Sequence, residues 1–172
     1  MAVSKRVLRG VRYAFGRGMD PRTKDGVRAH PFVLVAGMLL HTAIGAAILC
    51  LVFAALGLTL PSALRIVLLC AHAVGAVGGL ALLVRRLREP VLQAISVADD
   101  YASNLLAVAF VVTAACALLT PRANGLFFFA SAVLAIYAPF GKIRHCVLFF
   151  ITRARFGAFI GTRGVLVRRS HG

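Results

Sequence analysis

Four long stretches with almost no charged residues constrain this chain more than any other feature. They cover residues 31–60, 66–84, 101–121 and 123–141. Each provides the roughly 20 apolar residues that a helix needs to cross the hydrocarbon core of a bilayer. The core offers no water to unpaired backbone groups, so spans of this kind fold as helices. The sequence therefore predicts an all-α integral membrane protein, built as a four-helix bundle.

The positions of the basic residues predict the orientation in the membrane. Of the 20 Lys and Arg residues, 18 lie before the first span, between the second and third spans, or after residue 141. Only Arg65 and Arg122 lie in the other two loops. Basic residues that flank membrane spans stay on the cytoplasmic side, so both termini are expected in the cytoplasm, at a cytoplasmic membrane of the bacterial type. The net charge of +15 then reflects topology, and no binding to nucleic acid is expected.

Two basic segments flank the predicted membrane domain of residues 30–152. Residues 1–29 begin with apolar positions at helical spacing among basic residues, which predicts a helix on the membrane surface. Residues 20–26 are turn-rich and would separate this segment from the bundle. The tail of residues 153–172 contains too much glycine for a stable isolated helix. The two segments together offer a basic surface for a soluble partner protein or for anionic lipid headgroups.

Ionisable residues inside the spans are the candidate functional residues, because a bilayer makes them costly unless they have a partner. His41 lies in the first span and His72 in the second, whereas Lys142, Arg144 and His145 interrupt the end of the fourth. Neutral imidazole is a good ligand for haem iron, and the two cations would pair with haem propionates. One haem b held by two histidines is therefore the expected cofactor.

Depth along the helices selects the two iron ligands. His41 lies about 15 Å into the membrane from Pro31, at about 1.5 Å per residue. Counted back from Arg153, His145 lies about 12 Å deep on the same side. One haem would bridge His41 and His145. His72 is deeper, at about 20 Å; a hydrogen-bonded core residue is its simpler interpretation, and contact with haem or quinone is the alternative.

The fourth span is long for a bilayer. A helix from residue 124 to residue 151 would measure about 42 Å against a core of about 30 Å. Pro139 predicts a kink within it, because proline removes a helical hydrogen bond. If no haem is present, Lys142 and Arg144 lie near enough to the interface to reach the headgroups.

The sequence provides little support for an iron–sulfur or zinc site, for covalent haem or for ion transport. The four cysteines lie within apolar segments and form no Cys-x-x-Cys pair, which argues against iron–sulfur or zinc sites and against covalent c-type haem. All five acidic residues lie outside the charge-free spans. A proton pump or cation transporter would need a carboxylate inside the membrane.

Three stretches share their order and spacing with a known family: residues 78–90 (GGLALLVRRLREP), 117–121 (ALLTP) and 139–145 (PFGKIRH). They resemble the haem-b membrane subunit, or gamma subunit, of respiratory nitrate reductase. Related membrane subunits of dissimilatory sulfite reductase and heterodisulfide reductase-like complexes are also similar. The resemblance extends over about residues 25–165, and its third stretch is the most specific.

The resemblance implies two bis-histidine haems, a quinol site toward the outer face and an iron–sulfur partner on the cytoplasmic side. His41 and His145 match the ligands of the inner haem. Leu51 and Phe127 stand where the family has the ligands of the outer haem, so only the inner haem is expected. Arg65 matches a basic residue that the family associates with quinol, although an interfacial arginine that reaches the headgroups is the simpler interpretation.

Two hypotheses remain at this stage. In the first, the chain is a b-type cytochrome subunit that relays electrons between the quinone pool and a cytoplasmic iron–sulfur subunit, and a separate subunit of the complex carries the catalytic site. In the second, it is a haem-free anchor or assembly subunit that docks a redox partner through its basic surface. A second haem that uses His72 or His30 also stays open.

Overall fold

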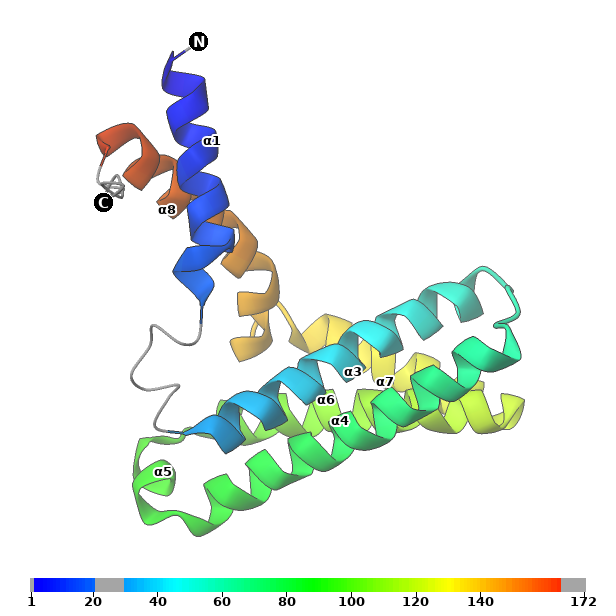
Figure 1. The fold of residues 1–172 in the computed structure, drawn as a ribbon. Helices are drawn as coiled ribbons and strands as arrows, with labels where there is room; N and C mark the ends of the chain where they lie inside the picture. Colours follow the sequence, from blue (N-terminus) through cyan, green and yellow to red (C-terminus); the bar gives the residue numbers. More distant parts are fainter. Residues whose placement is uncertain (1, 21–29, 165–172) are drawn as a thin grey trace. The chain divides into compact units, whose positions relative to one another are not determined.

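The structure is a computed structural model that describes residues 2–20 and 30–164 (Figure 1). Every regular secondary-structure element within these residues is a helix, which confirms the predicted all-α class. Contacts divide the chain into two compact units, residues 30–143 and a second unit formed by residues before 30 and after 143. Most of the predicted turn-rich linker, residues 21–26, and the end of the tail lie outside the described residues.

The first unit, here called the bundle unit, contains five α-helices. They are α3 (Pro31–Ala55), α4 (Ser62–Arg88), α5 (Pro90–Ile95), α6 (Ala98–Leu119) and α7 (Asn124–Tyr137). Prolines begin or directly precede several of these helices, where a missing backbone N–H costs nothing. The helices α3, α4 and α6 are long and apolar enough to cross a membrane. Three of the predicted spans are therefore confirmed by length and composition.

The fourth predicted span is shorter than the sequence suggested. Helix α7 ends at Tyr137 after 14 residues, about 21 Å of helix, and a 3₁₀ turn at Lys142–Arg144 precedes the next helix. The predicted kink at Pro139 is instead a complete break. Proline lacks a backbone N–H and disfavours helical geometry in the residue before it, and Gly141 follows two residues later.

Small residues determine how closely α3 and α4 pack. Helix α3 buries one stripe, Ala36, Leu40, Ala43, Ala47 and Cys50, with the spacing of three and four residues that keeps side chains on one face. Opposite this stripe, a Cβ atom at Gly78 would lie 2.9 Å from the carbonyl oxygen of Ala36. A Cβ atom at Gly75 would also overlap Ala43. The two backbones therefore approach closely because neither helix places a large side chain between them.

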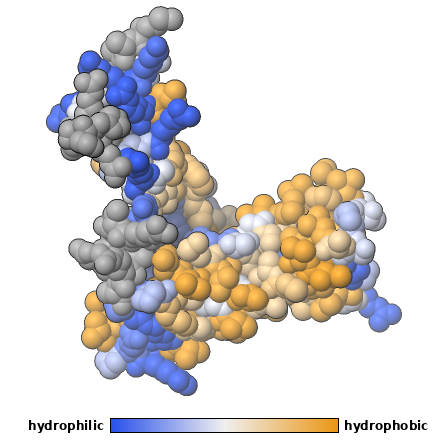
Figure 2. All heavy atoms as spheres, in the orientation of Figure 1, coloured by the Kyte–Doolittle hydropathy of each residue, from blue (hydrophilic) through white to orange (hydrophobic). Residues whose placement is uncertain are grey.

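The outer surface of the bundle unit is apolar. Met38, Val52, Ile66 and Val77 are among many large hydrophobic side chains that point outward from the three long helices. Figure 2 shows these apolar side chains along the helices, with hydrophilic residues gathered at the ends of the unit. A bilayer solvates such a surface, whereas water would not.

The second unit, here called the terminal unit, pairs the two ends of the chain. Helix α1 (Ala2–Phe15), followed by a 3₁₀ turn at Arg17–Met19, packs against α8 (His145–Arg163). Arg153 of α8 donates hydrogen bonds to the carbonyl oxygens of Ala14, at 2.8 Å, and Gly18, at 2.6 Å. The predicted N-terminal helix is therefore present, and its partner is the C-terminal helix of the same chain.

Glycines form the contact between α1 and α8. A Cβ atom at Gly10 would lie 2.7 Å from the backbone of Gly161, and one at Gly157 would lie 2.6 Å from the Cα atom of Val11. Gly157 and Gly161 are four residues apart, as are Gly10 and Ala14, and all four are buried. The glycine-rich segment is therefore helical through Arg163 because close packing against α1 replaces the stability that an isolated helix would lack.

Replacing Gly161 by leucine is expected to separate α1 from α8, because the new side chain has no space against the backbone of Arg6 and Gly10. Overpacking of this kind costs about 1–3 kcal/mol, so tryptic cleavage within the arginine-rich α1 should become at least about five-fold faster. Gly125→Leu is the control, since a Cβ atom at Gly125 meets nothing within 4 Å. Equal cleavage rates in both variants would contradict this account of the interface.

Candidate functional site

His41 lies near the middle of α3 with its side chain exposed on the surface of the helix. Its Nδ1 atom is 2.7 Å from the carbonyl oxygen of Gly37. Because a carbonyl accepts only, this contact places the proton on Nδ1 and leaves the lone pair on Nε2. A neutral imidazole that is held in one orientation through Nδ1–H is the usual form of a histidine metal ligand.

Two glycines leave open space on either side of His41. Gly37 and Gly45 are four residues before and after it, which places all three on one face of α3. A Cβ atom at either glycine would meet nothing within 4 Å. A flat group can therefore lie against the helix backbone around the His41 ring. A haem could be held here through His41, and the glycine spacing around this residue was already visible in the sequence.

His145 and Arg144 belong to the terminal unit, whereas His41 belongs to the bundle unit. His145 is the first residue of α8, exposed, with its Nε2 atom 3.9 Å from the Sγ atom of Cys146. Arg144 is also exposed, at the N-cap of α8. The pairing of His41 with His145 therefore stays a prediction.

Lys142 has an anionic partner within the bundle unit. Its Nζ atom lies 2.6 Å from Oδ1 of Asp100, and its backbone N–H donates to Oδ2 of Asp99 at 2.9 Å. Arg86 from the end of α4 approaches the same Asp100 oxygen at 3.1 Å. From their sequence position alone, these carboxylates are most simply a charge pair at a helix N-terminus, with contact to a partner as the alternative. Asp100 does accept a hydrogen bond from the backbone N–H of Val97 at 3.0 Å, and it also joins three separate segments of the chain.

The contacts of Asp99 and Asp100 form a polar junction, and Tyr137 extends it to the end of α7. Its hydroxyl donates to the carboxylate of Asp99 and lies 3.1 Å from Oγ of Ser103. The sequence analysis did not identify Tyr137 as a functional residue. Its only signal was its position, two residues before Pro139 and at the end of an apolar run. The junction fixes where the chain leaves α7 and therefore where Lys142 begins the turn toward His145.

His72 is the buried histidine of the bundle. It is 0% exposed, and its Nδ1–H donates to the carbonyl oxygen of Leu68. Its Nε2 atom has no hydrogen-bond partner among the described residues. Burial agrees with the interpretation as a core residue, and the unpaired nitrogen keeps the alternative of a ligand contact open.

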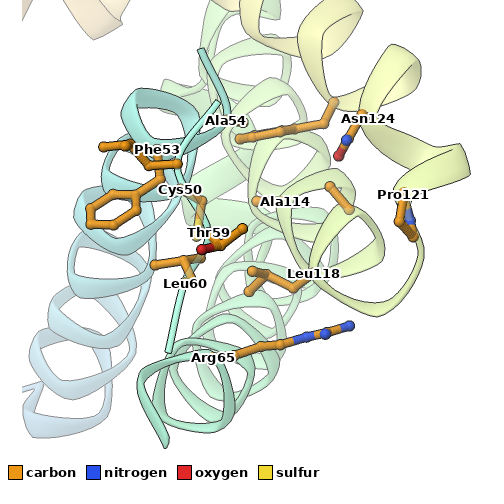
Figure 3. A pocket seen from close by; sticks show the side chains of 13 residues that line it. Cys50, Phe53, Ala54, Thr59, Leu60, Arg65, Ala114, Leu118, Pro121 and Asn124 are labelled. Atoms are coloured by element: carbon orange, nitrogen blue, oxygen red, sulfur yellow. The ribbon is translucent and has the colours of Figure 1, made fainter. Parts of the chain in front are cut away.

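A cavity of about 360 Å³ lies where the end of α3 meets the start of α4, the end of α6 and the start of α7 (Figure 3). Hydrophobic side chains form most of its wall, including Cys50, Ala117 and Phe127. Arg65, Thr59 and Asn124 add a guanidinium, a hydroxyl and an amide. Arg65 also donates to the carbonyl oxygen of Leu119 at 3.4 Å. An apolar space with a few hydrogen-bond donors suits a flat, weakly polar molecule.

Phe127 and Leu51 occupy the positions at which the resemblance would place the second haem. Phe127 is 1% exposed and stacks on Phe110 with ring centroids 5.6 Å apart. Leu51 packs against the same apolar cluster. These hydrocarbon side chains belong to the apolar core and offer no iron ligand, and the expected absence of an outer haem stays a prediction.

Metal chemistry within the described part of the chain depends on histidine pairs. These residues contain no group of three or more His, Cys, Asp or Glu side chains placed to hold a metal ion. The four cysteines are unpaired thiols. A haem needs only two protein ligands, so this finding leaves His41 and His145 as the candidates.

No known protein family, curated protein or solved structure matches this chain.

Proposed function

We propose that the chain is a membrane-bound b-type cytochrome subunit of a respiratory oxidoreductase complex. The observation that supports this best is the His41 site: an exposed imidazole on an apolar helix, oriented by Gly37 and flanked by open space at Gly37 and Gly45. A polar ring that faces lipid is costly, so a bound group or another helix must cover it. A haem covers the ring and also uses the Nε2 lone pair.

Each polar residue near the haem has a defined role in this proposal. His41 and His145 would hold the iron of one haem b, which would carry single electrons. Arg144 pairs with a propionate, because its guanidinium forms strong charge-assisted hydrogen bonds with carboxylates. Lys142 is a second propionate partner only if it gives up Asp100, to which it is 2.6 Å away. His72 stays in the core and stabilises the bundle.

The proposed topology is a four-helix bundle in the membrane, with α7 as its fourth helix and both termini in the cytoplasm. Helix α7 packs against α6 and touches α3, and its composition is as apolar as that of the longer helices. The 18 basic residues near the termini and the loop between α4 and α6 support this orientation in a bacterial-type cytoplasmic membrane.

The cavity beside Arg65 is the proposed quinone site. A quinone ring is apolar and carries two carbonyl acceptors, which match the hydrophobic wall and the donors of Arg65, Thr59 and Asn124. Cys50, at the cavity, is nine residues beyond His41, or about 14 Å along α3. Electrons would pass between this cavity and the haem, and then to an iron–sulfur subunit and a catalytic subunit on the cytoplasmic side.

A second candidate function rests on the Asp99 and Asp100 junction. Lys142 and Arg86 already have carboxylate partners there, so part of the predicted haem environment is neutralised without a haem. This favours, as the alternative, a haem-free anchor or assembly subunit that docks its redox partner through the basic termini. The two functions differ in one measurable property, the haem content of the purified chain.

Replacement of either proposed ligand by alanine is expected to remove the haem. The purified chain should contain one haem b, and His41→Ala and His145→Ala should each lower the content below about a tenth, because low-spin haem b needs both axial ligands. A pyridine haemochrome assay and a reduced-minus-oxidised spectrum measure this. His30→Ala is the control, since His30 precedes α3 and is exposed. A colourless native chain would favour the anchor function.

Filling the space beside His41 should displace the haem while both ligands remain. Gly45→Leu adds a side chain one turn from His41, on the same face of α3. We expect at least about a ten-fold loss of haem affinity, the effect of about 1.4 kcal/mol. Gly125→Leu adds the same side chain to open space on α7 and should keep the haem. Full haem content in Gly45→Leu would show that the haem does not lie against this face.

Filling the cavity beside Arg65 should slow electron exchange with quinone. Ala117 lines the cavity, and Ala115 on the same helix does not. In stopped-flow reduction of the haem by a quinol analogue, Ala117→Leu should lower the rate at least about ten-fold, and Ala115→Leu should leave it unchanged. Similar rates in the two variants would place the quinone elsewhere, for example nearer to His41.

A further inference from the structure

The terminal unit has two outer faces of different chemistry. Gly10 and Ala14 of α1 are buried against Gly157 and Gly161 of α8, so each helix turns its opposite face outward. The outer face of α1 carries the cations Lys5, Arg9 and Arg12, together with the exposed Leu8. The outer face of α8 carries large hydrophobic side chains together with two arginines. It consists of Leu148, Ile151, Arg155, Phe156, Phe159 and Arg163, all exposed.

The hydrophobic side chains of this α8 face are highly exposed for a protein surface. Phe156 is 50% exposed and Phe159 is 53% exposed, and Leu148 and Ile151 are similar. Helical spacing brings them onto one side, where they form an apolar strip that the exposed Thr152 and Arg155 interrupt. Water would solvate such a strip poorly, so a partner surface with an apolar interior must cover it.

The arginines around this strip are arranged as they are in interfacial helices. The guanidinium carbon of Arg163 lies 4.4 Å from the ring centroid of Phe159, whereas Arg153 is held at the contact with α1 by its hydrogen bonds to Ala14 and Gly18. Cations stacked on aromatic rings keep their charge at the rim while the rings face an apolar phase. This combination is typical of helices that lie in the headgroup region of a bilayer.

The charge of the unit indicates which headgroups it meets. Its described residues contain nine cations, Lys5, Arg6, Arg9, Arg12, Arg17, Arg144, Arg153, Arg155 and Arg163, and a single acid, Asp20. Such an excess is attracted to anionic lipid. The chain itself keeps the unit beside a bilayer, because the apolar helix α3 begins at Pro31, only eleven residues after Asp20.

We propose that the outer face of α8 lies in the interface of an acidic phospholipid bilayer, with Phe156 and Phe159 among the acyl chains and Arg155 and Arg163 at the phosphates. The opposite, cationic face of α1 then points away from the lipid and stays available to a protein. This proposal concerns the terminal unit alone and holds whether or not the bundle carries a haem.

The native chain contains no tryptophan, so a single introduced tryptophan reports on one position. The full chain with Phe159→Trp is reconstituted in phosphatidylglycerol vesicles with brominated acyl chains, which quench tryptophan on contact. Phe156→Trp is a second reporter on the same face, and Arg9→Trp is the control on the outer face of α1. Because an interfacial helix buries its apolar face about 5–10 Å deep, the α8 reporters should be quenched at least about three-fold more than the control.

A second comparison tests the acidic headgroups. In the Phe159→Trp chain, Arg155→Gln and Arg163→Gln should each weaken the docked state roughly five-fold, the effect of one basic residue near an anionic surface. Arg12→Gln, on the far face of α1, should have little effect. Replacing phosphatidylglycerol by phosphatidylcholine should also reduce the quenching. Protection of α1 from trypsin verifies that each variant keeps the terminal unit folded.

The outcomes that overturn the proposal are distinct. Equal quenching of Phe159→Trp and Arg9→Trp in acidic vesicles would show that the α8 face does not select the lipid. A blue-shifted but unquenched tryptophan at residue 159 would indicate burial against protein instead. Quenching that is the same in phosphatidylcholine would refute the role of the acidic headgroups.

Discussion

Close backbone contact between helices that lack large side chains is the interaction on which this structure depends. In the bundle unit, Ala36 and Ala43 of α3 meet Gly75 and Gly78 of α4. In the terminal unit, Gly10 meets Gly157 and Gly161. Inside lipid the hydrophobic effect does not hold helices together, so dispersion between the well-fitted surfaces of α3 and α4 is the expected attraction between these two candidate spans. Any side chain larger than hydrogen at these glycines removes that fit.

This mode of packing also explains where the functional groups lie. Because the small residues occupy the inner stripe of α3, the polar ring of His41 is left on the outer face between Gly37 and Gly45. The opposite arrangement occurs in α4, where His72 takes an inner position and is fully buried. The two histidines in neighbouring helices therefore differ in exposure, because His41 lies on the surface of the bundle unit and His72 lies in its core.

The polar junction around Asp99 and Asp100 connects three segments of the bundle unit. It joins the end of α4, the start of α6 and the residues that follow α7 through Arg86, Tyr137 and Lys142. Charged groups at such a position are costly unless they are paired, and here each carboxylate has partners. The turn that leads toward His145 is therefore held by a specific polar network, and not by the apolar packing that holds the rest of the bundle.

Much of this arrangement was determined by the sequence alone. Long charge-free stretches permit only helices in a bilayer, so the all-α class and the three long spans were predictable, whereas the role of His41 as a haem ligand stays a prediction. Only the tertiary structure showed that the fourth span breaks after Tyr137. Hydropathy does not show where a helix ends because of a proline and a polar junction. The tertiary structure also showed that the glycine-rich segment is helical through Arg163. Glycine weakens an isolated helix but permits the close contact with α1 that stabilises it, and a contact between residues about 150 positions apart in the chain is invisible to local sequence patterns.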